Sequence, residues 1–172
     1  MSDPSNRLRP GTEKLSRNHG VANFDCGTPV LNDWLIRLAL QNQQADAAQT
    51  YVACRENRVV GYYSLVAASV QRSDAPARIA KGLAGHPIGM ILLARLAVDQ
   101  REKGQGLGKA LLKNALGRIA QAADIIGARA ALVHAIDENA KRFYEHFNFE
   151  PSPIDSMHLM LLMKDLRALL RA

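Results

Sequence analysis

The sequence predicts one layered domain of mixed α/β (α+β) class, in which helices flank a central sheet. Its 172 residues match the usual size of a single domain, so we expect one domain over residues 1–172. Hydrophobic residues make up 48% of the chain and charged residues 22%, which supports a packed core and excludes a disordered protein. Helical and strand-like patterns alternate along the chain without an internal repeat or a long linker.

The first half of the chain predicts a leader, a helix and a hairpin. Residues 1–20 are polar and predict a loose leader that ends in a short edge strand. Thr28 and Pro29 suit the N-cap and the first turn of a helix. The apolar side chains that follow have helical spacing and predict a face toward the core: Leu31, Trp34, Leu35 and Leu38. Residues 50–54 and 59–70, separated by a polar turn, predict a β-hairpin.

The middle of the chain predicts an irregular excursion followed by a buried strand. Residues 71–87 contain two prolines and two glycines and predict an excursion with one short helix. Residues 91–98 are nearly all apolar, as in a central strand that is covered on both faces. A glycine-rich turn then leads to a helix over residues 107–123, and a second buried strand is expected over residues 130–135.

Three further elements complete the expected order. A helix is predicted over residues 138–147, with Asp137 as its N-cap. A last strand is expected over residues 157–163, followed by a short basic amphipathic helix over residues 164–172. The alternation of these elements predicts a single mixed structure with helices packed on a sheet.

Charge and cysteine content narrow the possible partners and compartment. Lys and Arg total 22 against 16 Asp and Glu, a net charge of +6 that favours nucleic acid or an anionic cofactor as partner. The alternative is a basic surface kept for solubility. Only Cys26 and Cys54 occur, too few for a disulfide scaffold and without metal-ligand spacing. No run approaches the roughly 18 apolar residues of a membrane-spanning helix, and the N-terminus is polar, so we expect a cytoplasmic protein.

The segment with the clearest chemical meaning is the glycine-rich turn. Gly104, Gly106 and Gly108 stand between a predicted strand and a predicted helix. Backbone N–H groups in such a turn form an anion cradle that a phosphate can approach closely; the alternative is a turn that needs glycine for its geometry only. A Walker A loop needs glycine at Lys103 and serine or threonine at Ala110, and a dinucleotide fingerprint fails similarly, so ATPases and NAD enzymes are disfavoured.

The turn fits the pattern Gln/Arg-x-x-Gly-x-Gly/Ala with the residues Arg101-Glu102-Lys103-Gly104-Gln105-Gly106. Here the chain resembles the GNAT superfamily of acetyl-CoA-dependent N-acetyltransferases, over roughly residues 20–163. The resemblance implies a mostly antiparallel sheet, splayed where the strands ending at Val98 and near Ala135 meet, with acetyl-CoA in the opening and no metal. It also implies a set of cofactor-binding residues: Leu96, Ala97, Val98, Arg101, Lys103, Gly104, Gln105, Gly106, Leu107, Gly108, Lys109 and Asn139.

The resemblance also implies roles in catalysis. It assigns the general acid to Tyr144, whose phenol stays protonated at neutral pH; the alternative is an aromatic core residue at helical spacing. The backbone N–H of Val98 is expected to polarise the thioester carbonyl. None of the five histidines has paired metal spacing, and no general base is evident. Asn148 stands where GNAT chains commonly have glycine, and it tolerates the left-handed conformation of a helix end.

A narrower resemblance covers residues 24–27, 31–35, 61–65 and 93–99, which are similar to the GNAT toxins of bacterial toxin–antitoxin pairs. It implies acetylation of the α-amino group of aminoacyl-tRNA, a block of translation, a ribbon-helix-helix antitoxin, operator DNA bound through that antitoxin, and a homodimer. The cations expected to bind tRNA phosphates are Arg72, Arg78, Lys81, Arg95, Lys113 and Arg118. Two alternatives stay open: acetylation of protein N-termini, lysines or small amines, and a non-catalytic DNA-associated component.

Overall fold

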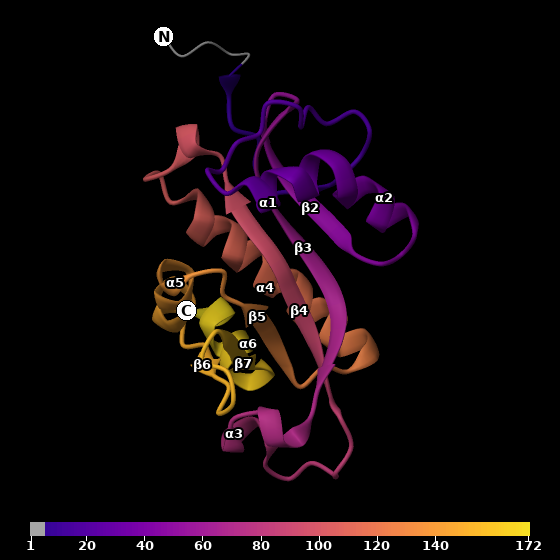
Figure 1. Cartoon of the computed structure of the whole chain (residues 1–172), viewed down its shortest axis with the longest axis vertical. Coiled ribbons are helices and arrows are strands. Elements are labelled where there is room, and N and C mark those ends of the chain that lie inside the picture. Colours follow the sequence, from indigo (N-terminus) through magenta and orange to yellow (C-terminus); the bar gives the residue numbers. More distant parts are fainter. Residues whose placement is uncertain (1–5) are drawn as a thin grey trace. The chain divides into compact units, whose positions relative to one another are not determined.

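The computed structural model describes residues 6–172. The chain forms two compact units, Met1–Val66 with Arg95–Ala115 (unit 1) and Ala67–Ala94 with Leu116–Ala172 (unit 2). Seven strands form one mixed sheet in the order β1-β2-β3-β4-β5-β7-β6. Figure 1 shows strands β3 (Arg58–Val70) and β4 (Ile88–Val98) and helix α4 (Leu107–Ile126). Each of these three elements contributes residues to both units. The predicted sheet with flanking helices is confirmed.

Unit 1 is built on the predicted hairpin. Strand β2 (Gln49–Arg55) pairs antiparallel with β3, and the turn at Glu56 has a left-handed φ of 49°. Strand β1 (Glu13–Lys14) adds the predicted short edge strand to β2. Residues 8–15 of the predicted leader are tied to this strand, since Arg9 N–H donates to the Cys54 carbonyl at 2.8 Å and Leu15 is buried. They cover an edge that would otherwise be open to pairing. Residues 1–5 of that leader lie outside the described residues.

The predicted first helix starts at Pro29 and has a different face from the one expected. It consists of α1 (Pro29–Asp33), a π-helical turn η2 (Trp34–Leu38) and α2 (Ala39–Gln44). Trp34 and Leu35 are buried as predicted, but Leu38 is 44% exposed and Ala39 is fully buried in its place. A π turn adds one residue to the helical repeat, so it shifts the inward position by one. The prediction that Leu38 faces the core is wrong for this reason.

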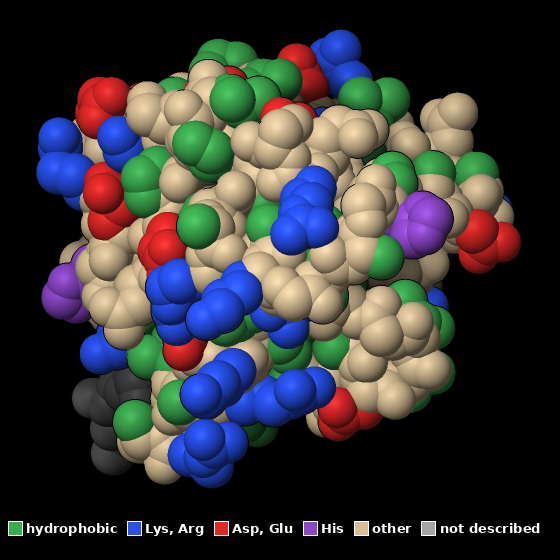
Figure 2. Space-filling view, turned by 90° about the horizontal axis from the view of Figure 1, so that it is seen from below, with side chains coloured by type: hydrophobic (Ala, Val, Ile, Leu, Met, Phe, Trp, Pro, Cys, Tyr) green, Lys and Arg blue, Asp and Glu red, His purple; other side chains and the backbone are tan. Residues whose placement is uncertain are grey.

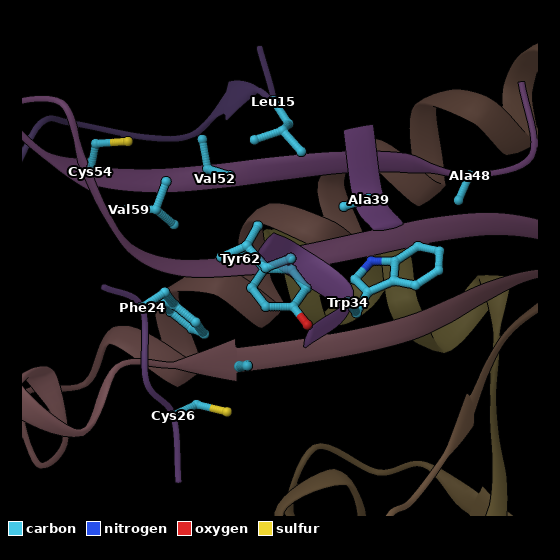
Figure 3. Close-up of a cluster of buried hydrophobic side chains, with 12 residues drawn as sticks. Leu15, Phe24, Cys26, Trp34, Ala39, Ala48, Val52, Cys54, Val59 and Tyr62 are labelled. Atoms are coloured by element: carbon cyan, nitrogen blue, oxygen red, sulfur yellow. The ribbon is translucent and has the colours of Figure 1, made fainter. Parts of the chain in front are cut away.

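The core of unit 1 lies between this helix and the hairpin (Figure 3). The rings of Phe24 and Tyr62 meet edge to face at 5.6 Å, and the Tyr62 hydroxyl donates to the Leu31 carbonyl at 2.7 Å. Trp34 Nε1 donates to Ser64 Oγ at 3.0 Å. Thr50 Oγ1 lies 2.7 Å from the same oxygen. These buried polar atoms are therefore satisfied, which fixes the helix on the strands in one position.

Unit 2 holds the excursion and the C-terminal elements. The excursion contains η3 (Arg72–Asp74) and the expected short helix α3 (Ala77–Ala80). Strand β5 (Ala130–His134) pairs parallel with β4 from Met90 to Leu93, and β7 (His158–Leu162) pairs antiparallel with β5. Strand β6 (Glu150–Pro151), which pairs with β7, was not expected. Its two residues are too few to give a strand signal.

Two helices of unit 2 lie where the sequence predicts them, and the first has its predicted N-cap. Helix α5 (Glu138–His146) is capped by Asp137, whose carboxylate accepts the Ala140 N–H at 2.8 Å. Asn148 follows α5 with a left-handed φ of 70°, as expected. Helix α6 (Met163–Arg171) buries Leu166 and ends the chain. Within residues 6–172, no helix combines the length and apolar character needed to cross a membrane.

Candidate active site

The turn after β4 has the geometry of an anion cradle. Gly104 and Gly106 have left-handed φ values of 83° and 80°, and a Cβ at either position would meet no atom within 4 Å. The turn opens helix α4, whose first turn has N–H groups without intrahelical partners and the positive end of the helix dipole. A pyrophosphate can therefore approach the backbone here, as the sequence predicts. The residues present fit the pyrophosphate of acetyl-CoA.

Two buried carboxylates brace this turn through ion pairs with arginines. Asp99 is 1% exposed and accepts hydrogen bonds from the backbone and guanidinium of Arg101 and from Asp25 N–H. Burial alone would raise the pKa of Asp99, but these hydrogen bonds outweigh it and lower the pKa to about 2. Glu102 is likewise buried and accepts from Arg55 Nε and Nη2 at 2.9 and 2.8 Å. The acids beside the turn thus act as structural anchors.

Two of the basic side chains that were predicted to bind phosphate at the turn contact other groups of the protein. Arg101 is held by Asp99, and Lys103 Nζ donates to the Cys26 carbonyl at 2.9 Å. Gln105 and Lys109 are exposed. The roles of these residues in binding a phosphate stay predictions.

The strand before the turn presents two different faces. Ala97 is buried in the core with Trp34 and Tyr62, whereas Leu96 and Val98 are partly exposed. Alternation along a strand places the latter pair on the opposite face. Leu107 and Gly108 open helix α4, and both are partly buried. Unit 1 therefore brings together all the predicted cofactor residues except Asn139, which lies exposed on α5 of unit 2.

Gly61 is a structural residue of this region that sequence reasoning missed. It lies in β3, and a Cβ added there would approach Leu111 Cδ1 of helix α4 to 2.8 Å. Only glycine permits this close packing of helix on strand without a shift. The signal was present in the sequence, because an isolated glycine inside a strand pattern indicates a close approach of another element.

Tyr144, the predicted general acid, lies on α5 in unit 2. Its side chain is 7% exposed, and its ring meets Phe143 and Phe149 edge to face at 5.2 and 5.4 Å. Burial raises the pKa of the Tyr144 phenol, so it stays protonated at neutral pH. Within residues 6–172 no group accepts a hydrogen bond from its hydroxyl. A buried phenol with its proton free to donate suits an acid, and an aromatic core role accounts for its ring contacts.

The predicted tRNA-binding cations fall into two groups. Arg72, Arg78 and Lys81 line an open cavity of about 1040 Å³ in unit 2. Arg78 also bridges Glu150 and Asp165, and Arg72 donates to the Leu83 carbonyl. Lys113 is exposed on the unit 1 part of α4, whereas Arg118 is half-buried on its unit 2 part. Figure 2 shows Lys and Arg side chains gathered over part of one face.

Arg95 differs from the other predicted cations because it is half-buried against an aromatic ring in unit 1. Its guanidinium carbon lies 3.6 Å from the centroid of the Trp34 ring. Burial lowers the pKa of Arg95 from its ordinary value, although an arginine remains charged at neutral pH. No group of three or more His, Cys, Asp or Glu residues that could hold a metal occurs in the described part of the chain.

The fold and this glycine turn together define a class of acyl-CoA-binding proteins, and sequence similarity identifies the family within that class. The family described as "Acetyltransferase (GNAT) domain" matches residues 46–151, and the chain belongs to this family. The tRNA-acetylating toxin of Mycobacterium tuberculosis (strain ATCC 25618 / H37Rv) is 50% identical over 157 residues, which are 91% of this chain and 94% of the relative. The predicted family and its toxin branch are confirmed.

Solved structures give the same result. AtaT complexed with acetyl-methionyl-tRNAfMet has a TM-score of 0.87 and 27% identity, covering 95% of this chain and 99% of that one. A mutant AtaT bound to acetyl-CoA and to the C-terminus of the antitoxin AtaR has a TM-score of 0.80 and 25% identity, covering 94% and 98%. An AtaT–AtaR complex bound to DNA has a TM-score of 0.75 and 26% identity, covering 92% and 97%. The acetyltransferase class expected from the sequence is confirmed.

Proposed function

We propose that this chain transfers the acetyl group of acetyl-CoA to the α-amino group of aminoacyl-tRNA and thereby blocks translation. The observation that carries the proposal is the half-identical tRNA-acetylating toxin, whose similarity extends over nine-tenths of the chain. The glycine turn, with its two left-handed glycines at the start of α4, supplies the anion cradle that such a cofactor needs. The cavity that Arg72, Arg78 and Lys81 line supplies cations for RNA phosphates.

Unit 1 would hold the cofactor. Acetyl-CoA supplies an acetyl thioester. The N–H groups of Gly104 to Lys109 would bind its pyrophosphate, with Arg101 and Lys103 adding positive charge around the turn. The backbone of Leu96, Ala97 and Val98 would bind its extended arm, and the Val98 N–H would polarise the thioester carbonyl. Asn139 of unit 2 would contact the pantetheine or pyrophosphate region.

Tyr144 would act as the general acid. Its hydroxyl would donate a proton to the departing thiolate sulfur as the C–S bond breaks and the amide C–N bond forms, and the proton lost from the amine nitrogen would pass to water and restore the phenol. The raised pKa keeps this proton in place before the reaction, and no acceptor in residues 6–172 competes for it. The α-amine of an aminoacyl ester is less basic than a lysine amine, so a substantial fraction is neutral at physiological pH. The site therefore needs no strong general base.

Partners follow from the same proposal. AtaT is solved with the C-terminus of the antitoxin AtaR and, as the AtaT–AtaR complex, on DNA. By this likeness we infer that the present chain binds an antitoxin and, through it, DNA. The ribbon-helix-helix type of that antitoxin and the operator as its DNA site are what the sequence resemblance implies. A homodimer and a cytoplasmic location, where charged tRNA is found, complete the assignment.

The decisive assay incubates the purified chain with labelled acetyl-CoA and total charged tRNA. Parallel reactions contain deacylated tRNA, free amines and peptides. The proposal expects label in charged tRNA alone, lost when the ester is hydrolysed, with mass analysis naming the amino acid. Label in peptides or small amines would replace the tRNA assignment with another GNAT reaction. Absence of label in every reaction would contradict both and favour the non-catalytic, DNA-associated alternative.

A further inference from the structure

Within residues 6–172, the half-buried guanidinium of Arg95 lies over the Trp34 ring and interacts electrostatically with the Tyr62 phenol. Three other half-buried arginines have anionic or carbonyl partners: Arg55 and Arg58 face Glu102, and Arg129 donates to the Ile79 carbonyl. Among residues 6–172, Arg95 has no ion pair with a carboxylate and donates no hydrogen bond. A partly desolvated cation is costly without an anion, so this arrangement indicates that the anion comes from a ligand.

The guanidinium of Arg95 is held in a fixed orientation. Trp34 covers its flat face and is itself 8% exposed and anchored through Nε1 to Ser64. Stacking on an aromatic ring uses only the face of the guanidinium. The N–H donors lie in its plane and remain available as a fork that fits two oxygens of a phosphate. Arg95 is therefore preorganised for an oxyanion.

The position of Arg95 along β4 separates it from the cofactor phosphates. It precedes Val98 by three residues, which is about 10 Å along a strand. The glycine turn lies beyond Val98 in the opposite direction along the chain. If Val98 N–H meets the thioester carbonyl, then Arg95 lies on the side of the thioester away from the cofactor phosphates, which leaves that side for the acceptor in the scheme below.

The dimensions of an aminoacyl-tRNA match this separation. About eight covalent bonds join the α-amine to the phosphorus of the last internucleotide linkage, a span of roughly 8–10 Å. We propose that Arg95, stacked on Trp34, binds this last internucleotide phosphate and so positions the α-amine at the thioester. The inference rests on the proposed function and adds to it which part of the substrate this residue holds. Arg95 is a positioning residue in this scheme.

The test measures the contribution of this one phosphate to binding, apart from the contributions of the other phosphates in the RNA. Short RNAs ending in CCA are prepared with a normal last linkage and with an uncharged methylphosphonate there. Binding is measured by fluorescence anisotropy for the wild type, Arg95→Gln, Arg95→Lys and the control Arg37→Gln. Arg37 carries the same charge on the same helix as Trp34, but its side chain is 75% exposed.

We expect the methylphosphonate to weaken binding to the wild type and to Arg37→Gln about tenfold, with a salt slope lower by about one. Arg95→Gln should bind normal RNA about tenfold more weakly and show no further loss with the methylphosphonate. Arg95→Lys should recover only part of the loss, since it keeps the charge without the planar fork. In turnover, the KM for charged tRNA should rise and the KM for acetyl-CoA should stay unchanged.

Other outcomes assign the residue differently. Equal methylphosphonate losses in the wild type and Arg95→Gln would overturn the inference, whatever the total affinity of the variant. A raised KM for acetyl-CoA would overturn it in favour of a cofactor contact. If the wild type acetylates no charged tRNA but the phosphate effect still depends on Arg95, the phosphate contact stands and the proposed function falls. Thermal melting of each variant keeps loss of folding apart from loss of binding.

Discussion

Asp99 and Arg101 are joined by three hydrogen bonds, two from the guanidinium and one from the Arg101 backbone N–H. This pair lies directly before the glycine turn, and Asp99 also accepts the Asp25 N–H from the segment that precedes α1. The first residue of the phosphate-loop pattern therefore braces the loop through its side chain. The buried carboxylate thus fixes the start of the glycine-rich segment that forms the cradle.

We predict that Asp99→Asn loosens this turn. The change removes the charge from a side chain that is 1% exposed and weakens its hydrogen bonds to Arg101, so the free energy of unfolding should fall by about 1–3 kcal/mol. The KM for acetyl-CoA should rise as well, because the cradle loses its brace. Denaturant titration measures the first effect and steady-state kinetics the second. Asp33→Asn, at a half-exposed carboxylate, is the control and should change neither.

The contribution of Asp99 should depend on pH in one direction. Its pKa in the folded protein is about 2, below the ordinary 3.8, so its stabilising effect is complete above the ordinary pKa. It should be lost as pH falls from that value toward 2. The difference in unfolding free energy between wild type and Asp99→Asn should therefore be flat above roughly pH 5 and shrink below it. A difference that grows on acidification would contradict the role of the carboxylate.

Gly61→Ala should destabilise the contact between β3 and α4. The new Cβ would lie 2.8 Å from Leu111 Cδ1 and 3.4 Å from the Ala97 carbonyl oxygen, so the buried Leu111 side chain would have to move. Overpacking of this size costs about 1–3 kcal/mol. Gly117→Ala is the matched control, because a Cβ there meets nothing within 4 Å and α4 is helical. It should stabilise by about 0.5–1 kcal/mol, and equal effects at both glycines would refute the packing argument.

Periodicity predicted most of the secondary structure, and its failures have local causes. The hairpin, α4, α5 and their cap signals follow from patterns that short segments carry by themselves. The π turn at Trp34–Leu38 could not be predicted, because the spacing of apolar residues does not reveal one extra residue in a helical turn. Strand β6 has only two residues, and its existence depends on pairing with β7.

Only part of the candidate site could be predicted from the sequence. The glycine turn has a sequence pattern tied to its function, so its residues could be named. The contacts that Arg101 and Lys103 make within the protein could not be predicted. Their partners, Asp99 and the Cys26 carbonyl, are placed beside them by the folded structure. The stacking of Arg95 on Trp34 could not be predicted either, because the two residues lie 61 positions apart in the sequence. Contacts between distant positions carry no signal in a single sequence.

Tyr144→Phe should reduce turnover by about 10²–10⁴-fold while leaving the affinity for acetyl-CoA near that of the wild type. Stability should also be almost unchanged, because the hydroxyl has no acceptor within residues 6–172. Tyr62→Phe is the contrasting variant. Its hydroxyl donates to the Leu31 carbonyl at 2.7 Å, so its loss should lower the unfolding free energy by about 1 kcal/mol. Equal loss of cofactor binding and of turnover in Tyr144→Phe would indicate a packing role instead.

Lys81→Gln should weaken tRNA binding in a salt-dependent way. Lys81 is exposed at the cavity that Arg72 and Arg78 also line, and in the described residues no acid pairs with it. Loss of one phosphate contact should lower the slope of log affinity against log salt by about one. Arg78→Gln should have a further effect, because Arg78 also holds Glu150 and Asp165, and its loss should lower the melting temperature. Lys164→Gln, an exposed lysine of α6, is the control; if it lowers the slope equally, binding depends on total charge rather than on this cavity.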